Sequence, residues 1–233
     1  MTVRAALKSL RTPFRRARGR SAMSRGRVSS TKPLCREFGY SRGTPVDRYY
    51  IESFLDHHSA DIRGRVLEVG DDGYSRRFGG SRVTKQDILH VDQAHRKATI
   101  VGDLADRDTL PAQAFDCIIL TQTLHLIFDM AGAIQTLHQA LRPEGVLLIT
   151  VPGITPIDVG PWKESWYWSL TDLALGRLLS GPFDPARVSG STRGNLFAAT
   201  AFLHGAAVEE IEATKLDLFD AAYPVTVAAR AQA

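Results

Sequence analysis

Small and acidic residues follow four short apolar segments of this sequence, at the point where each segment ends. The first segment runs into 68–73 (EVGDDG), and the next three are followed by Asp92, Asp103 and Thr121-Gln122. In an open parallel sheet, ligands bind at the carboxyl ends of the strands, where all these positions would lie. The spacing therefore predicts one ligand site built from four strand ends.

The residue types suit a nucleoside ligand. Gly70 and Gly73 allow the backbone to approach a ligand closely and to adopt dihedral angles closed to other residues. Asp92 could accept hydrogen bonds from both hydroxyls of a ribose, and Asp103 could accept one from the exocyclic amine of adenine. Each Asp alone is as readily a turn or a helix cap, but four such positions in register favour a ligand site.

Histidine and aromatic residues follow the later strands. His125 lies just after Gln122, and a neutral imidazole there could take a proton from a hydroxyl, or it could pack against the next loop. An aromatic cluster beyond residue 153 has flat faces that suit sugar rings or planar aromatic molecules, with core packing as the alternative. The cluster is Trp162, Trp166, Tyr167 and Trp168, and we predict substrate contacts for Trp162, Trp166 and Tyr167.

These positions need a parallel sheet to bring them together. Near-continuous apolar strands that alternate with helical segments indicate such a sheet, covered by helices on both faces. The predicted strands are 65–69, 88–91, 99–101, 117–120, 146–151 and 223–229, with a further short run at 187–191. The predicted helices are 46–57, 130–141, 171–179 and a long helix at 195–213.

Charge separates a tail from the rest of the 233-residue chain. Residues 1–36 contain 11 Lys or Arg and no acid, whereas the remainder contains 18 basic and 25 acidic residues. The tail has few apolar residues, so we predict that 1–36 is disordered. It could contact an acidic partner or stay solvated; because no aromatic residues alternate with its arginines, we expect no stable nucleic-acid complex.

The two cysteines are Cys35 and Cys117. They are too few for a disulfide framework or a cysteine-built zinc site, so we predict free thiols, no metal and a cytoplasmic protein. No stretch approaches the roughly 18 apolar residues that a membrane span needs. The sequence leaves the oligomeric state open, a homodimer included.

Five segments resemble, in this order, the motifs of class I S-adenosylmethionine-dependent methyltransferases, in particular the small-molecule group. They are 65–73 (RVLEVGDDG), 90–92 (HVD), 102–104 (GDL), 115–120 (FDCIIL) and 141–152 (LRPEGVLLITVP). The resemblance implies a Rossmann-like, doubly wound α/β fold whose seven-stranded sheet is mostly parallel with an antiparallel last strand. The domain at 37–233 would then comprise an N-terminal lid helix at 37–64, a cofactor-binding core at 65–153 and, at 154–233, a helical cap with the last strands.

The resemblance also implies S-adenosylmethionine as cofactor and a role for each matched residue. Glu68 and Gly70 would shape the loop for the methionine part, Asp92 would bind the ribose, Asp103 and Leu104 would frame the adenine, and Thr121 and Gln122 would lie beside the sulfonium. Asp72 stands where the family has the middle glycine of its loop, and the segment 71–87 is short, so we expect an abbreviated first helix.

The segment 41–50 (SRGTPVDRYY) precedes the first strand, where such methyltransferases place a helix over the cofactor. We predict that Arg48 and Tyr49 meet the cofactor, because Arg pairs bidentately with carboxylates and Tyr supplies a wall and a donor. A packing helix with a solvated Arg is the alternative.

Together these features predict a methyltransferase that acts on a hydroxyl of a small molecule or a sugar or glycan, with His125 as the candidate base. A non-catalytic methyltransferase-like partner protein remains an alternative. A nicotinamide-dependent oxidoreductase is less favoured, because no Gly-x-Gly-x-x-Gly opens the first crossover.

Overall fold

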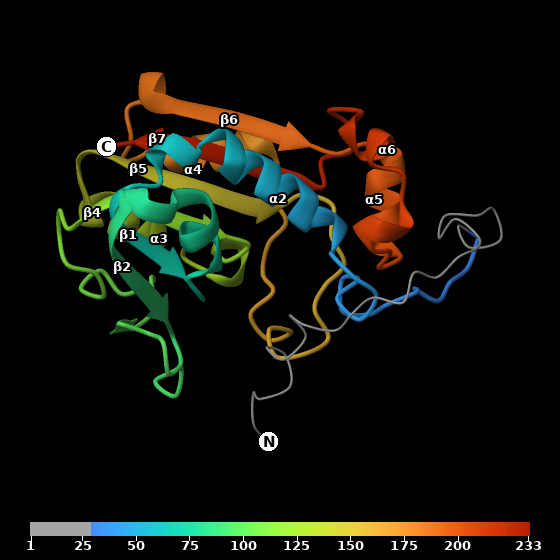
Figure 1. Cartoon of the computed structure of the whole chain (residues 1–233), viewed down its shortest axis with the longest axis horizontal. Helices are drawn as coiled ribbons and strands as arrows, with labels where there is room; N and C mark the ends of the chain where they lie inside the picture. Colours follow the sequence, from blue (N-terminus) through green and yellow to red (C-terminus); the bar gives the residue numbers. More distant parts are fainter. Residues whose placement is uncertain (1–28) are drawn as a thin grey trace.

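A seven-stranded sheet lies at the centre of the computed structural model, which describes residues 29–233 (Figure 1). The strand order is β3-β2-β1-β4-β5-β7-β6. The strands are β1 (Gly64–Val69), β2 (Val83–His90), β3 (Ile100–Val101), β4 (Phe115–Thr121), β5 (Leu141–Pro152), β6 (Val188–Arg193) and β7 (Thr226–Gln232).

Strands β1 to β5 run parallel to one another, and β7 lies antiparallel between β5 and β6. This arrangement confirms the predicted α/β fold with its antiparallel last strand. The predicted strand at 223–229 is β7, displaced by three residues toward the C-terminus, and the short run at 187–191 is β6.

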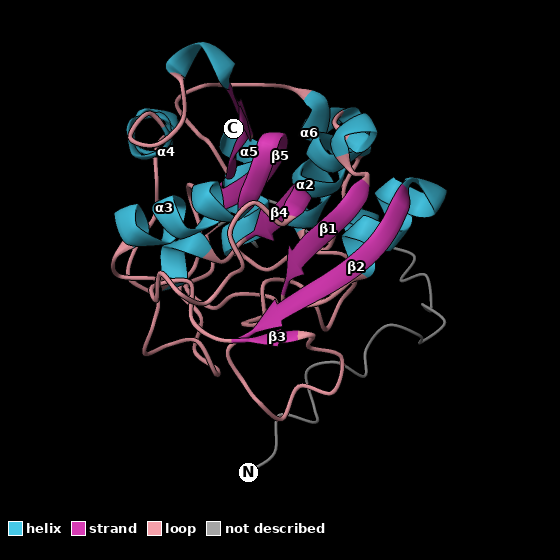
Figure 2. Cartoon of the chain, turned by 90° about the vertical axis from the view of Figure 1, so that its left-hand side faces the viewer, coloured by secondary structure: helices cyan, strands magenta, loops and turns pink. Residues whose placement is uncertain are grey.

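Helices cover both faces of the sheet, as Figure 2 shows. Alternation along β4 explains the two layers: Cys117 and Ile119 pack on the side of α2 (Val46–His57), and Ile118 and Leu120 pack on the opposite side. That opposite layer holds α3 (Met130–Ala140) and α4 (Asp172–Leu179). A strand buried on both faces needs this continuous apolar run, so the fold follows directly from the sequence pattern.

The predicted helices 46–57, 130–141 and 171–179 are confirmed as α2, α3 and α4. Asp129 caps α3 by accepting a hydrogen bond from the backbone N–H of Gly132 at 2.9 Å. The first crossover is abbreviated, as expected, to one π-helical turn, η3 (Ser75–Gly79). Short 3-10 turns complete the chain: η2 (Ser59–Asp61), η4 (Gly80–Arg82), η5 (Leu124–Leu126), η6 (Pro185–Arg187) and η7 (Val208–Glu210).

The predicted long helix at 195–213 is wrong. The structure has two short helices there, α5 (Leu196–Leu203) and α6 (Ala213–Asp217), separated by a turn and η7. Gly205 ends the first with φ +67°, and its backbone lies so close to Cys35 that an added Cβ would sit 2.2 Å from that residue's carbonyl oxygen. The apolar residues of the segment favour a helix, but long-range contacts of its backbone with Cys35 break the helix at Gly205.

Residues 34–45, which we call the N-terminal strap, pack along this interrupted region. The backbone N–H groups of Leu34 and Cys35 donate to the carbonyl oxygen of His204, and Pro45 bridges to Ala207. The boundary predicted for the disordered tail, residue 36, is therefore too late, since these residues are part of the domain. The rest of the tail prediction, residues 1–28, lies outside the described residues.

Cys35 and Cys117 are both free thiols, as predicted, and both are buried. Within residues 29–233, none of the helices combines the length and the apolar character needed to traverse a bilayer.

Gly205→Ala should destabilise the domain by about 1–3 kcal/mol, because the added methyl group collides with backbone at a positive φ. Urea denaturation measures the change. Gly176→Ala is the matched control: the position lies inside α4 with open space around a Cβ, so it should stabilise by about 0.5–1 kcal/mol. Equal effects of the two substitutions would contradict the role given to Gly205.

Candidate functional site

The glycine loop that follows β1 leaves an open surface at the carboxyl edge of the sheet. Gly70 has φ +99°, a conformation that favours glycine, and its N–H donates to the carbonyl oxygen of Leu89 in β2 at 2.9 Å. Apart from the adjoining residues of the loop, no heavy atom of residues 29–233 lies within 4 Å of a Cβ built on Gly70 or on Gly73. The loop therefore presents bare backbone that a ligand can approach.

Glu68 of β1 stabilises this loop through hydrogen bonds to its backbone. Its side chain is only 4% exposed, and it accepts hydrogen bonds from the N–H of Tyr74 at 3.0 Å and from the N–H and hydroxyl of Ser75 at 2.8 and 2.6 Å. Burial raises the pKa of Glu68, although the bonds from Ser75 and Tyr74 oppose that shift. Glu68 thus fixes the backbone of the loop at the point where η3 begins.

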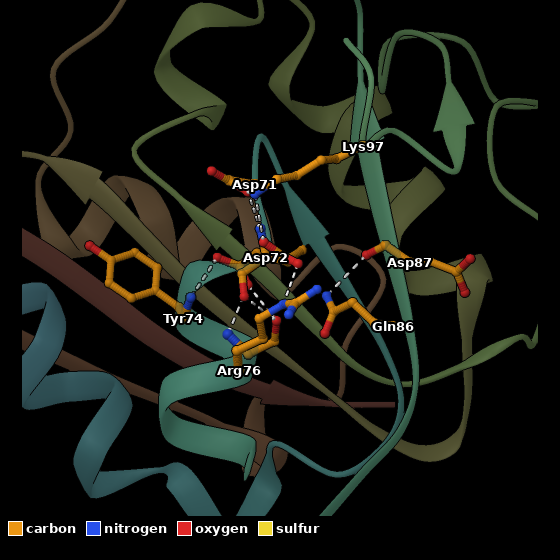
Figure 3. Close-up of polar contacts among 9 residues, drawn as sticks. Asp71, Asp72, Tyr74, Arg76, Gln86, Asp87 and Lys97 are labelled. Carbon is orange, nitrogen blue, oxygen red and sulfur yellow. Dashed lines mark hydrogen bonds and ion pairs between the residues drawn. The ribbon is translucent and has the colours of Figure 1, made fainter. Parts of the chain in front are cut away.

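Asp72, the residue that departs from the family's glycine pattern, is buried and surrounded by cations (Figure 3). Arg76 donates to it from one side, and the Lys97 ammonium lies 3.3 Å from Asp72 and 3.1 Å from Asp71. Lys97 belongs to the segment between β2 and β3, so these ion pairs join the loops that follow the first two strands.

Asp92 follows β2 in a tight turn. Its Oδ1 accepts from the N–H of Ala94 at 2.8 Å, and its own N–H donates to Nδ1 of His90 at 2.9 Å. The His90 ring stacks on His95 with centroids 4.2 Å apart. Asp92 therefore stabilises a turn, which was one of its two expected roles. Its Oδ2 makes no hydrogen bond within the described part of the chain, so this atom can still accept one from a ligand.

The third and fourth strand ends differ in exposure. Asp103 is exposed and caps a similar turn at Ala105, at 2.9 Å, whereas the side chain of Leu104 is buried in the core. Thr121 is half-buried and pairs in register with Thr150 of β5.

Gln122 combines backbone strain with an unsatisfied side chain. Its φ is +46°, which is uncommon for a residue other than glycine, and its N–H donates to the carbonyl oxygen of Thr150 at 2.9 Å. Its side-chain Nε2 is buried and has no hydrogen-bond partner among residues 29–233. Strain and an orphaned donor in one residue are typical of a ligand site.

Arg48 of α2 reaches the glycine loop. Its guanidinium donates to the hydroxyl of Tyr74, which directly follows Gly73, and to the hydroxyl of Tyr40 in the strap at 2.8 and 3.0 Å. No carboxylate in the described chain lies within ion-pair distance of Arg48, although its pKa is raised above the ordinary value by the Tyr40 and Tyr74 hydroxyls and by Asp47, against burial. Tyr49 is engaged elsewhere, because its hydroxyl donates to Asp217 of α6.

His125 is 1% exposed, and neither of its ring nitrogens has a partner within residues 29–233. Burial alone lowers the pKa of His125 to about 4, so the imidazole is neutral near pH 7. Trp166 packs edge-on against it, with centroids 4.4 Å apart. The backbone N–H groups of Tyr167 and Trp168 donate to the carbonyl oxygen of His125 at 3.2 and 3.3 Å, which joins the aromatic loop to the end of β4.

The aromatic loop has buried and exposed members. Trp166 stacks on Phe38 of the strap at 5.6 Å, and its Nε1 is buried without a partner in the described chain. Trp162 and Tyr167 are 43% and 49% exposed. The structure thus brings Trp166 together with His125, and it leaves Trp162 in the solvated part of the loop.

Sequence reasoning missed Phe38, Tyr40 and Tyr74. Tyr74 carries a signal, because it directly follows the glycine loop. Phe38 and Tyr40 carry none, because they lie in an irregular segment without periodicity and meet their partners only through the fold.

The methyltransferase domain family matches residues 31–182. The chain belongs to this family. The fold is also similar to that of an S-adenosylmethionine-dependent methyltransferase from Archaeoglobus fulgidus, with a TM-score of 0.54. The two sequences are 12% identical, and the match covers 80% of this chain and 94% of that one. No curated protein matches the sequence significantly.

Two further structures share the fold of this methyltransferase. The N-methyltransferase NodS from Bradyrhizobium japonicum, in complex with S-adenosylhomocysteine, is 12% identical over 88% of this chain and 93% of that one, with a TM-score of 0.52. The DszA carbon methyltransferase is 14% identical over 84% and 57%, with a TM-score of 0.51. Because one fold serves nitrogen and carbon acceptors, the fold does not choose the acceptor atom.

The family and the fold confirm the predicted enzyme class, an S-adenosylmethionine-dependent methyltransferase. Groups of His, Cys, Asp and Glu that could hold a metal ion do not occur among residues 29–233.

His125→Phe should make folding less sensitive to acid. The folded-state pKa of about 4 lies below the ordinary 6.5, so the unfolded chain binds the proton more tightly. Stability is then unaffected above pH 6.5 and falls between pH 6.5 and about 4, by up to about 3 kcal/mol for this residue. Urea denaturation from pH 7.5 to 4.5 should show a smaller loss in His125→Phe than in the wild type.

His138→Phe serves as control for the acid experiment, because His138 is only half-buried. Its replacement should reduce the acid sensitivity much less. Parallel pH profiles for the wild type and His125→Phe would contradict the buried neutral imidazole.

Proposed function

We propose that this methyltransferase methylates a hydroxyl oxygen of a small molecule or of a sugar or glycan. The observation that supports this acceptor is His125, a buried neutral imidazole at the carboxyl edge of the sheet with both ring nitrogens unpartnered in the described chain. Aromatic side chains that suit a ring-shaped acceptor adjoin it.

The residues at the strand ends fit S-adenosylmethionine. The open space above Gly70 and Gly73 accommodates a ligand against bare backbone, and the orphaned Nε2 of Gln122 offers a donor. Arg48 supplies a cation without an acidic partner in the described chain, held beside the glycine loop by Tyr74. These three features, which are space, a donor and a positive charge, support a cofactor site at this edge of the sheet.

We assign the cofactor contacts accordingly. Arg48 binds the methionine carboxylate, because its guanidinium is oriented by two phenol hydroxyls and has no carboxylate of the described chain within ion-pair distance. The free Oδ2 of Asp92 accepts from the ribose, and Asp103 with the backbone of Leu104 borders the adenine. Thr121 and Gln122 line the side nearest the acceptor, and Glu68 acts by fixing the loop.

S-Adenosylmethionine, when bound, supplies an electrophilic methyl carbon. His125 would hold, at one of its ring nitrogens, the proton that the acceptor hydroxyl loses on methylation, and would release it to solvent. A weakly basic imidazole suffices, because the acceptor oxygen becomes strongly acidic as it gains the methyl group. The chain otherwise aligns the acceptor with the reacting carbon.

Trp166 covers His125 in this structure, edge-on at 4.4 Å. The proposed role of His125 therefore requires the indole to move when the acceptor binds. The strap residue Phe38 stacks on Trp166, so the strap and the indole would move together.

Asp92→Ala should weaken binding of S-adenosylhomocysteine and of 5′-methylthioadenosine by about 1.5–3 kcal/mol each, because both ligands contain the ribose. Isothermal titration calorimetry measures both affinities. Asp184→Ala is the matched control, since Asp184 caps a similar exposed turn at Ala186, just before β6. Failure of the wild type to bind the cofactor or its product at roughly millimolar concentration would sink the proposal.

Arg48→Met should weaken binding of S-adenosylhomocysteine by about 10–100-fold, because it removes a charged pair with the carboxylate. It should leave 5′-methylthioadenosine unchanged, because that ligand has no carboxylate. The comparison separates a direct contact from a general loss of structure. Arg177→Met, at an exposed position of α4, should change neither affinity; equal losses for both ligands in Arg48→Met would rule out the carboxylate contact.

A further inference from the structure

Two exposed aromatic rings form a corner at the acceptor edge. Phe128 is 69% exposed and Tyr167 is 49% exposed, and their ring centroids lie 5.4 Å apart at an interplanar angle of 79°. Phe128 comes from the loop between β4 and α3, and Tyr167 comes from the loop between β5 and α4. We call this pair the aromatic corner.

The aromatic corner adjoins the proposed base. The N–H of Tyr167 donates to the carbonyl oxygen of His125 at 3.2 Å, and Phe128 lies three residues beyond His125. Phe128 also packs on Trp168 at 5.6 Å, which fixes one side of its ring. The aromatic corner is therefore anchored to the segment that carries His125.

The shape of the aromatic corner selects among ring-shaped acceptors. The two rings are nearly perpendicular, so they do not enclose a flat molecule between two parallel faces. A pyranose ring has one C–H face that packs on a single aromatic face, and its hydroxyl groups lie around the rim. A perpendicular corner accommodates the apolar face and leaves the rim free.

The surroundings of the aromatic corner are polar and solvated. Lys163 and Glu164 form an exposed ion pair in the same loop, with side chains 60% and 85% exposed. Trp162, a third exposed aromatic residue, is held there by Asp158, which accepts from its backbone N–H at 2.9 Å. Aromatic faces among exposed charges suit a hydroxyl-rich ligand, because the rim of a sugar keeps its hydrogen bonds to water and charged groups.

We propose that the acceptor is a pyranose sugar, whose C–H face packs on Phe128 and Tyr167 while one hydroxyl points toward His125. This inference rests on the proposed function and narrows it from any hydroxyl to that of a sugar ring. Phe128 and Tyr167 are then the residues that determine the specificity for the acceptor.

The test measures transfer of a tritiated methyl group from S-adenosylmethionine to two panels. One panel contains methyl pyranosides of the common hexoses, 6-deoxyhexoses and hexuronic acids, and the other contains planar phenols such as hydroxybenzoates and flavonoids. We expect label in at least one pyranoside and in no phenol. Phe128→Ala and Tyr167→Ala should each raise the KM for the labelled pyranoside about tenfold, the loss of one aromatic contact, with kcat within about threefold.

Leu173→Ala is the control variant, because Leu173 is an exposed apolar residue of α4 outside the aromatic corner, 81% exposed. It should leave KM unchanged. The affinity for S-adenosylhomocysteine should be the same in all three variants, which shows that the cofactor site is intact. Tyr167→Phe should retain most of the affinity for the pyranoside, because the ring face carries the contact.

Three results would overturn the inference: label in phenols and not in pyranosides, label in neither panel by an enzyme that binds S-adenosylmethionine, or a pyranoside KM that Phe128→Ala and Tyr167→Ala leave unchanged. In each of these the proposed cofactor site survives. A wild-type chain that binds neither S-adenosylmethionine nor S-adenosylhomocysteine overturns the proposed function itself, and this inference falls with it.

Discussion

The hydrogen bonds that Glu68 accepts from the backbone of Tyr74 and Ser75 fix the loop on which the cofactor edge depends. Burying a carboxylate is costly unless hydrogen bonds satisfy it, and these bonds are available only when the chain turns sharply after Gly70. The turn carries Tyr74 to Arg48, and it leaves Gly70 and Gly73 as open backbone. One buried acid in β1 thus determines both the shape of the loop and the place of the nearest cation.

The departure from the family's glycine pattern is compensated by charge. Asp72 is buried where a glycine usually stands, and Arg76 and Lys97 neutralise it from two sides. Because Lys97 follows β2, the compensation also joins the first two loops of the site. A change that would weaken an isolated glycine loop therefore adds a connection between the loops that follow β1 and β2.

The region that follows β4, by contrast, leaves polar groups unsatisfied. Within residues 29–233, Gln122, His125 and Trp166 each bury a polar atom without a partner. Each such group costs about 1–3 kcal/mol, and the hydrophobic clusters on both faces of the sheet must offset the sum. Unsatisfied groups gathered beside strand ends are the usual sign that stability has been given up for binding.

The sequence by itself determined the elements and their order. The helical spacing at 46–57 predicted α2 with both of its ends, and short apolar runs followed by small or polar residues predicted the strands that contain Glu68 and Thr121 and the strand that precedes Asp92. Such patterns are local, because periodicity reflects which face of each element is buried. The same logic failed at 195–213, where the strap packs against the segment and Gly205 turns the chain.

Only the tertiary structure decided which side chains meet. Arg48 and Tyr74 are 26 residues apart, and their contact depends on how α2 crosses the end of β1. The stacking of Phe38 on Trp166 depends on a strap that has no periodic pattern, and the aromatic corner depends on two loops that parallel pairing of β4 and β5 places together. Residue types indicate which chemistry is possible. Strand order and long-range packing decide which side chains contact one another, because those contacts join segments far apart in the chain.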